Sequence, residues 1–381
     1  MAAKRAAFFF GSGISFDSGA PTVDQLTEAV FRSGWEAHTD LRFFPIPSRS
    51  TGEAERVQEF LRILQAHITP HLREREERNP NYEDLYDAAV QIVSDETAEI
   101  VNPLIAEASA SVRKATEHLF RDQRAHIDDN RYASLADRAS DLVQWAVFHE
   151  IGKARQPVGL DVIPGIAAAT EELDIFSLNH DLLIERELGQ RRIAFADGFG
   201  ERWGDALRFN WSWNEPGTKV RLYKLHGSID WYLFRSKQNV DQFGKIRADP
   251  DHCRDENGNR LSLLQPQPRF LTGTTVKERS YAITVTGECF AELRKRLTTH
   301  RVLICCGYGW GDKGINVRIN QWVRDAPENK LVILHKGSTD ELKAKRFWLF
   351  KWDAYERTGK LSVIPKWLSE CTVSDFAHVL A

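Results

Sequence analysis

The chain has 381 residues, of which 42% are hydrophobic and 28% are charged, and its formal net charge is −3. This length accommodates one large domain or two ordinary ones, and the apolar share is enough for a packed core. A net charge so close to zero argues against a dedicated nucleic-acid surface, and no window of the sequence approaches a membrane span.

The cysteine pattern excludes two further classes. None of the five cysteines belongs to a C-x-x-C pair, which argues against a disulfide framework and against a tetrathiolate zinc site. The five apolar residues after Lys4 and Arg5 are too few for a secretory signal peptide. We therefore expect a protein of the reducing cytosol that binds no metal.

The chain opens with a short apolar run, residues 6–10, that ends at Gly11-Ser12-Gly13. An apolar run bounded by glycine predicts a strand buried on both faces of a parallel sheet. A glycine turn between a strand and a helix offers backbone amides to a phosphate. Alone, this turn is as typical of ordinary turn chemistry as of a nucleotide site, and its spacing is not the G-x-G-x-x-G of dehydrogenases.

The next part of the chain has mainly helical patterning. A helix is predicted over residues 22–35 and a loop over 38–52, and Ser50 with Glu53 predicts a capping box at the start of a longer helix. Further apolar residues at helical spacing continue to residue 151. We interpret this stretch as a helical insertion of roughly a hundred residues between two strands of a sheet.

After the insertion, strands and helices alternate. The sequence predicts strands at 173–177, 301–306, 331–335 and 362–364, strand-like alternation over 190–235, helices ending at 189 and spanning 314–325 and 338–347, and a long surface loop or small lobe over 236–280. Such alternation predicts an α/β fold, namely a Rossmann-like, doubly wound parallel sheet with a large helical insertion.

Polar side chains follow two of the later predicted strands. Asn179 and Asp181 come directly after residues 173–177, and His226 follows Tyr223-Lys224-Leu225. Taken singly, these residues are typical of an Asx turn, a helix N-cap and a structural histidine. Because ligands of doubly wound sheets bind at the carboxyl ends of the strands, the same residues could also share one site.

Four stretches together are similar to one known family. Residues 11–21, Gly-x-Gly-Ile-Ser-x-x-Ser-Gly-x-Pro, resemble the NAD-binding opening of the sirtuins. Residues 177–181 resemble the sirtuin motif Thr-Gln-Asn-Ile-Asp, and residues 225–228 look like its Leu-His-Gly-Ser element. Residues 307–316 are similar to the Gly-Tyr-x-x-x-Asp-x-x-Ile-Asn element of bacterial sirtuin-like proteins of anti-phage defence.

The departures from the sirtuin pattern separate the functions that the resemblance allows. Thr22-Val23-Asp24 stands where sirtuin deacylases have Asp-Phe-Arg, and Leu178 replaces their glutamine. Their four-cysteine zinc module is also missing from the sequence. The chain therefore better resembles the sirtuin-like NAD hydrolases. An NAD-dependent protein deacylase and a non-catalytic module that senses NAD or ADP-ribose are the alternatives.

The resemblance implies that NAD is the substrate and that the bond between nicotinamide and ribose is cleaved to give nicotinamide and ADP-ribose. Asn179 would position water or the ribose, Asp181 would hold the carboxamide and stabilise positive charge, and His226 would act as a general base. The remaining residues implied to contact NAD are Gly11, Ser12, Gly13, Ser15, Gly19, Pro21, Thr22, Gly227, Ser228, Gly307, Tyr308, Asp312 and Asn316.

The resemblance also implies how the protein is organised and regulated. Residues 1–52 and 152–350 would form the catalytic domain, 53–151 an inserted helical subdomain, and 351–381 an extension packed on the core. A hydrolase that empties the NAD pool would be toxic, so we expect a cytoplasmic abortive-infection effector that is silent until it is assembled. The expected partners are further copies of the chain and a HerA-like ATPase or a short Argonaute, with no membrane and no direct nucleic-acid contact.

Overall fold

The structure is a computed structural model that describes residues 5–50, 52–99, 102–120, 129–235, 241–246, 249–273, 277, 284–345, 347–348 and 351–377. Its contacts divide the chain into two compact units. The sheet unit comprises residues 1–20, 152–270 and 280–381, and the helical unit comprises 21–151 and 271–279. The helical unit thus includes residues 21–52 as well as the predicted insertion. The boundaries of functional domains stay a prediction.

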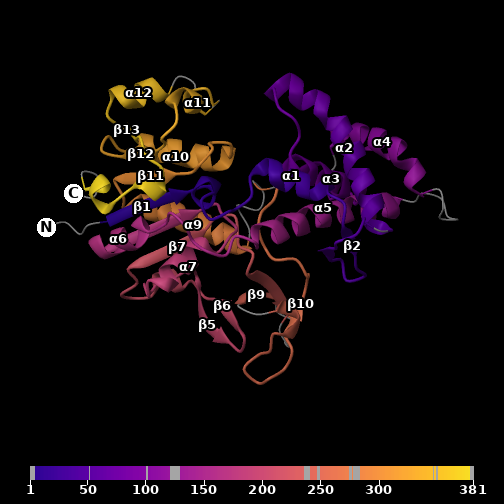
Figure 1. The fold of residues 1–381 in the computed structure, drawn as a ribbon, viewed down its shortest axis with the longest axis horizontal. Coiled ribbons are helices and arrows are strands. Elements are labelled where there is room, and N and C mark those ends of the chain that lie inside the picture. The colour runs from indigo at the N-terminus through magenta and orange to yellow at the C-terminus, as the bar shows by residue number, and fades with distance from the viewer. Residues whose placement is uncertain are drawn as a thin grey trace. The chain divides into compact units, whose positions relative to one another are not determined.

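The sheet unit is built on a six-stranded sheet in the order β13-β12-β11-β1-β4-β7 (Figure 1). Every neighbouring pair in this sheet is parallel. The strands are β1 (Arg5–Phe10), β4 (Glu172–Ser177), β7 (Val220–Lys224), β11 (Val302–Cys306), β12 (Lys330–Leu334) and β13 (Leu361–Ile364). Short apolar runs with buried side chains on both faces account for β1, β11 and β12, as the sequence predicts.

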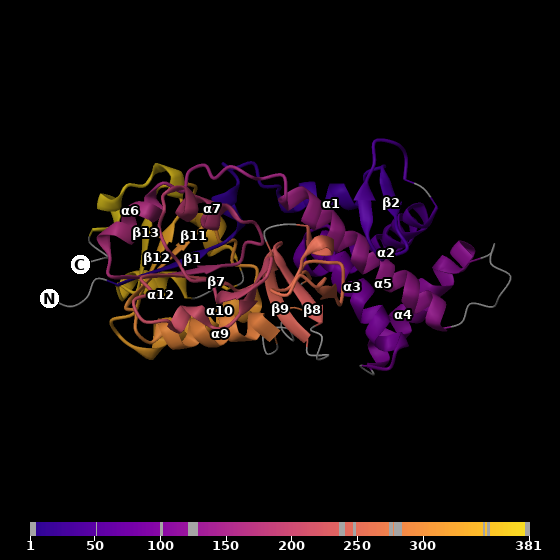
Figure 2. The same ribbon diagram turned by 90° about the horizontal axis from the view of Figure 1, so that it is seen from below.

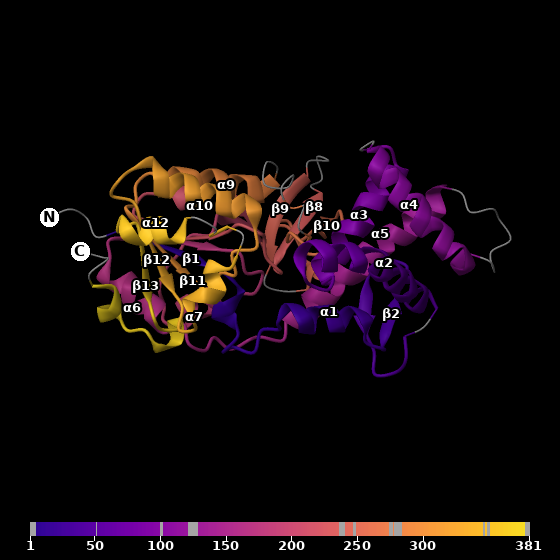
Figure 3. The ribbon, with the colours of Figure 1, turned by 90° about the horizontal axis from the view of Figure 1, so that it is seen from above.

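Helices cover both faces of this sheet. Figures 2 and 3 show α6 and α7 on one face and α9, α10 and α12 on the other. The helices of this unit are α6 (Val162–Ala169), α7 (Leu183–Gln190), α9 (Thr284–Leu297), α10 (Lys313–Asp325), α11 (Thr339–Lys343) and α12 (Trp352–Arg357). The prediction of a doubly wound parallel α/β sheet is therefore confirmed.

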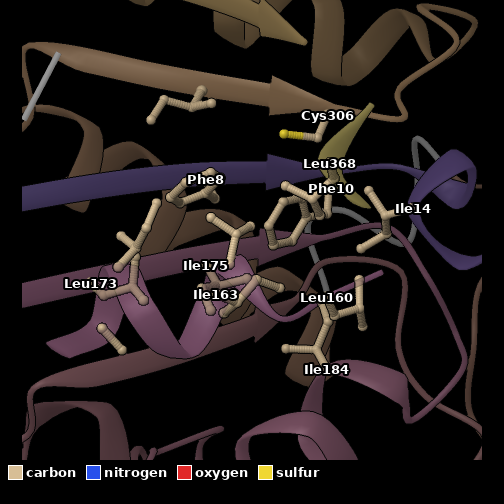
Figure 4. Close-up of a cluster of buried hydrophobic side chains, with 14 of the residues drawn as sticks. Phe8, Phe10, Ile14, Leu160, Ile163, Leu173, Ile175, Ile184, Cys306 and Leu368 are labelled. Carbon is tan, nitrogen blue, oxygen red and sulfur yellow. The ribbon is translucent and has the colours of Figure 1, made fainter. Parts of the chain in front are cut away.

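The apolar core of the sheet unit follows the pleat of the strands. Phe8 and Phe10 of β1 lie on the same face as Ile175 of β4, where they pack with Ile163 of α6 and Ile184 of α7 (Figure 4). Side chains from the C-terminal segment, among them Leu368 and Phe376, complete the same cluster. Because successive side chains of a strand point to opposite faces, Phe9 faces the other side of the sheet.

The sequence predicts only part of the second sheet of this unit, namely the strands within residues 190–235. This sheet has five strands in the order β10-β8-β9-β6-β5, and all its neighbours are antiparallel. The strands are β5 (Phe199–Trp203), β6 (Ala206–Phe209), β8 (Trp231–Arg235), β9 (Asp241–Ile246) and β10 (Ser262–Leu263). The strands β9 and β10 lie in the stretch predicted as a surface loop or small lobe, of which residues 236–240, 247–248, 274–276 and 278–280 lie outside the described residues.

The helical unit contains α1 (Val23–Phe31), α2 (Glu53–Glu76), α3 (Tyr82–Glu96), α4 (Pro103–Thr116) and α5 (Asp129–Ile151), with the short hairpin of β2 (Trp35–Ala37) and β3 (Phe43–Pro45). The predicted capping box at Ser50 is wrong. The Ser50 hydroxyl accepts the amides of Gly34 and Trp35, both at 3.0 Å, and α2 begins after Gly52 without a side-chain cap.

Candidate active site

The predicted site loops leave one edge of the parallel sheet. They follow β11, β1, β4 and β7, which are neighbours in the sheet. Since parallel strands all end at the same edge, residues 11–15, 178–181, 226–228 and 307–312 start close together. Leu178 continues the contact with β1, because its amide donates to the Phe10 carbonyl at 2.9 Å.

Ser15 joins two of the predicted catalytic residues. Its hydroxyl donates to Asp181 Oδ2 at 2.8 Å, and Asn179 Nδ2 donates to the same hydroxyl at 2.9 Å. A carboxylate only accepts, so the serine proton points to Asp181 and the serine lone pairs face the amide nitrogen of Asn179. These two hydrogen bonds orient the Asn179 side chain with Nδ2 toward Ser15.

In the same arrangement one hydrogen-bond acceptor, the side-chain oxygen of Asn179, has no donor among the described residues. This atom, Oδ1, is buried. Both oxygens of Asp181, by contrast, are engaged, because Oδ1 accepts the Leu183 amide at 3.0 Å at the start of α7. A buried acceptor without a donor costs about 1–3 kcal/mol. Asn179 Oδ1 is therefore able to accept a hydrogen bond from a ligand hydroxyl or a water molecule.

His226 faces a carboxylate from a different loop. Its Nε2 lies 3.2 Å from Oδ2 of Asp312, and both side chains are largely buried. In the neutral ring the nitrogen that faces a carboxylate carries the proton. Asp312 was predicted as an NAD contact, and the structure places it as the partner of the predicted general base.

His180 connects the two groups of side chains. Its ring centroid lies 6.2 Å from that of His226 and 4.7 Å from that of Phe270. Its carbonyl accepts the Ile229 amide at 3.1 Å. The loop that carries Asn179 and Asp181 is thus attached to the loop that carries His226.

The glycine turns pack against one another. A Cβ on Gly11 would lie 2.5 Å from the Gly307 carbonyl oxygen, and one on Gly13 would lie 2.7 Å from the Gly307 Cα. The Gly11 amide donates to the Cys306 carbonyl and the Gly13 amide to the Gly307 carbonyl, each at 3.0 Å. The two glycines expected to cradle a pyrophosphate thus have their amides engaged by protein carbonyls, and close loop packing accounts for both of them.

Tyr308 and Asn316 stabilise the turn after β11. The Tyr308 hydroxyl lies 2.9 Å from Asn316 Oδ1, and Asn316 Nδ2 donates to the Trp310 carbonyl at 2.9 Å. Burial raises the pKa of the Tyr308 hydroxyl well above its ordinary value, so this group stays protonated. Gly307 itself has a φ of 64°, which favours glycine.

The other residues predicted to contact NAD lie at separate places in the structure. Ser12 is exposed, and Gly19 has a φ of 78° with open space around its Cα. Gly227 also has a φ of 78° and lies against the backbone of residues 269–270, and the Ser228 amide donates to the Arg269 carbonyl at 3.1 Å. Pro21 and Thr22 belong to the helical unit, where Thr22 caps α1.

Lys224 is a residue of this edge that the sequence prediction missed. It is the last residue of β7 and is 2% exposed. Its ammonium group donates to the Asp181 carbonyl and lies 3.1 Å from Oε1 of Glu185. The available signal was a lysine at the end of an otherwise mostly apolar strand.

The described residues show no metal cluster and no membrane-spanning helix. Within the described residues, no group of three or more histidine, cysteine, aspartate or glutamate side chains could hold a metal ion. No helix in that part of the chain is long and apolar enough to cross a membrane. Two surface hollows of about 350 and 290 Å³ lie on the helical unit beside Arg62 and contain no predicted site residue.

No family model matches the chain, and no curated protein matches it. The chain is similar to the crystal structure of a Sir2 homolog–NAD complex, with 12% identity, a TM-score of 0.36, and coverage of 100% of this chain and 92% of that one. It is also similar to an ADP-ribose complex of a Sir2 homologue with a histidine-to-asparagine mutation, with 12% identity, a TM-score of 0.36 and coverage of 99% and 92%. The order and direction of the strands define the fold of this chain.

Proposed function

We propose that this protein is an NAD+ hydrolase that cleaves the bond between nicotinamide and ribose, with water as acceptor. The observation that carries the proposal is the Ser15 hydroxyl, which joins Asn179 and Asp181 at one edge of the sheet. These residues stand in the motifs that resemble the sirtuin NAD site.

The buried acceptor of Asn179 supports a sugar ligand. Oδ1 lacks a donor within the described residues, and both a ribose hydroxyl and a water molecule supply one. The amides of Gly11 and Gly13, by contrast, already donate to protein carbonyls. Contacts to the pyrophosphate are therefore proposed to come from Ser12 and from other groups of the loop.

The reaction needs few catalytic groups. The bond from C1′ to the nicotinamide nitrogen breaks, and its electron pair neutralises the pyridinium, so no strong general acid is required. The water oxygen bonds to C1′ while the sugar has oxocarbenium character, as in other glycosyl transfers. The proton released from water goes to the imidazole of His226, whose Nε2 faces Asp312.

We further propose that the enzyme is a defence effector of the cytoplasm whose activity is turned on by assembly, either with further copies of itself or with a partner such as a HerA-like ATPase or a short Argonaute. The motif resemblance is the basis for this part of the proposal. The low exposure of Asn179, Asp181 and His226, between 4% and 6%, fits a state in which the loops must rearrange before NAD enters.

The test is nicotinamide release from NAD+, measured by chromatography, for the purified full chain alone and co-purified with the product of the adjacent reading frame. Asn179→Ala and His226→Ala should each lower the rate by about 10²-fold or more, because each removes a positioned catalytic group. Asn257→Ala and His252→Ala are matched controls, since both residues are exposed and lie in the loop before β10.

Three results would contradict the proposal. Folded Asn179→Ala and His226→Ala proteins with undiminished rates would remove the assigned roles. A wild-type protein that binds NAD but releases no nicotinamide in either preparation would favour a sensing module, and release that depends on an acylated peptide would favour a deacylase.

A further inference from the structure

The sheet unit contains a cluster of buried charges that the proposed reaction does not use. Two lysines and three carboxylates form it, and their side chains are at most 10% exposed: Lys224, Lys245, Glu185, Asp197 and Asp230. Removing such charges from water costs several kcal/mol per ion unless partners compensate. A cluster of this kind therefore needs either a structural or a functional reason.

Lys245 has its own partners within the cluster. Its ammonium group contacts Asp197 and lies 3.6 Å from Oδ2 of Asp230. Glu185 forms its ion pair with Lys224, whose Nζ lies 3.1 Å from Oε1 of Glu185. Burial raises the pKa of Glu185, and Lys224 and then Lys245 oppose that rise.

The second hydrogen bond of Lys224 reaches the proposed active site. An ammonium group has three protons and no acceptor, and one of the Lys224 protons is donated to the main-chain carbonyl of Asp181. The neighbouring carbonyl, that of His180, accepts the Ile229 amide. Two successive carbonyls of the Asn179–Asp181 loop are thus held by groups from the end of β7 and the turn after it.

We infer that Lys224 is a positioning residue, which acts through the Asp181 carbonyl to hold the Asn179 and Asp181 side chains in place against Ser15. This inference rests on the proposed function, since it assigns Lys224 to the same site. Glu185 neutralises the lysine and directs its ammonium group toward the carbonyl. The lysine itself makes no contact with substrate in this assignment.

Substitutions of Lys224 and of Glu185 should have different effects on catalysis. Lys224→Met removes the donor to the carbonyl, whereas Glu185→Gln keeps that donor and removes only the paired charge. We expect Lys224→Met to lower kcat by about 10- to 100-fold with little change in KM, because small displacements of positioned groups cost this much. Glu185→Gln should have a clearly smaller effect, and Lys224→Arg should recover part of the loss.

Hydrogen–deuterium exchange of the ligand-free protein gives a readout that does not depend on activity. Amides of residues 179–183 should exchange faster in Lys224→Met than in the wild type, while Glu185→Gln stays close to the wild type. Lys295→Met is the control for a lost lysine, since Lys295 is 60% exposed on α9.

The variant Lys224→Met could unfold because it leaves Glu185 charged and unpaired. The double variant Lys224→Met/Glu185→Leu removes both charges and should fold, yet it should remain slow and exchange quickly at 179–183. Recovery of wild-type kcat and exchange in the double variant would overturn the inference, as would equal effects of Lys224→Met and Glu185→Gln. If the wild type releases no nicotinamide, the proposed function fails, while exchange still decides the role of Lys224.

Discussion

Asp312 serves two neighbours with its two oxygens. Oδ1 accepts the Ile315 amide at 2.9 Å and caps α10, and Oδ2 faces His226 at 3.2 Å. Because the cap holds Oδ1 at the start of its own helix, the carboxylate is fixed with Oδ2 facing His226. This arrangement lets one carboxylate orient an imidazole that lies 86 positions earlier in the chain, as 312 minus 226 shows.

Exchange of Asp312 for asparagine tests this orientation at the residue scale. Asp312→Asn can still cap α10 through Oδ1, but it no longer presents a charge to His226. We expect nicotinamide release to fall by about 10²-fold while the thermal stability changes little, because the proton is no longer directed to Nε2. Asp325→Asn, an exposed aspartate at the end of the same helix, is the control. Unchanged activity in Asp312→Asn would separate this carboxylate from the reaction.

At the scale of single elements, α3 shows how local sequence and structure agree. The side chain of its cap, Asn81, accepts hydrogen bonds from the amides of Glu83 and Asp84. In turn, the Asp84 carboxylate accepts the Asn81 amide at 2.8 Å. Arg78 binds Asp84 through both of its terminal nitrogens. Every group involved lies between residues 78 and 84, so this helix start depends on local sequence alone.

Removal of this cap should have a local cost. Asn81→Ala should lower the free energy of unfolding of the helical unit by about 1 kcal/mol, because two amides lose their acceptor. Denaturant titration followed by circular dichroism measures the change. Asn79→Ala is the matched control, since its side chain is exposed and accepts a hydrogen bond from the exposed Arg73. A loss as large in the control as in Asn81→Ala would remove the special role of the cap.

At the scale of the whole molecule, each unit buries its own apolar side chains. Phe8, Ile175 and Leu222 lie in the core of the sheet unit. Val57, Phe60 and Leu85 of the helical unit are fully buried as well. Two cores of this kind are typical of units that unfold as separate cooperative steps.

Scanning calorimetry should therefore resolve two transitions that respond to different substitutions. Gly307→Ala should lower the free energy of unfolding of the sheet unit by about 1–3 kcal/mol, and with it the temperature of that transition. Gly307 has a φ of 64°, and a Cβ added there would lie 2.5 Å from the Ile14 nitrogen. Asn81→Ala should move only the other transition. A single transition that both substitutions shift together would contradict two separate steps.

The sequence alone was sufficient for the parallel sheet and for the positions of the loops at its edge. The strands β1 and β11 contain continuous apolar runs that end at glycine turns, β4 is partly apolar and ends at a polar turn, and this pattern is local. The sequence also indicated Asn179, Asp181 and His226, because chemically active side chains directly after strands are placed by the strands themselves. Whether these residues perform the assigned roles stays a prediction.

Only the tertiary structure decided the partners. Ser50 accepts amides from residues 34 and 35 instead of capping its own helix, the Gly11 and Gly13 amides are taken by residues 306 and 307, and Lys224 reaches the carbonyl of residue 181. The antiparallel strands β9 and β10 likewise depend on distant pairing. A donor bonds to whichever acceptor the fold brings near, and residues far apart in the chain leave no periodic trace of that choice in the sequence.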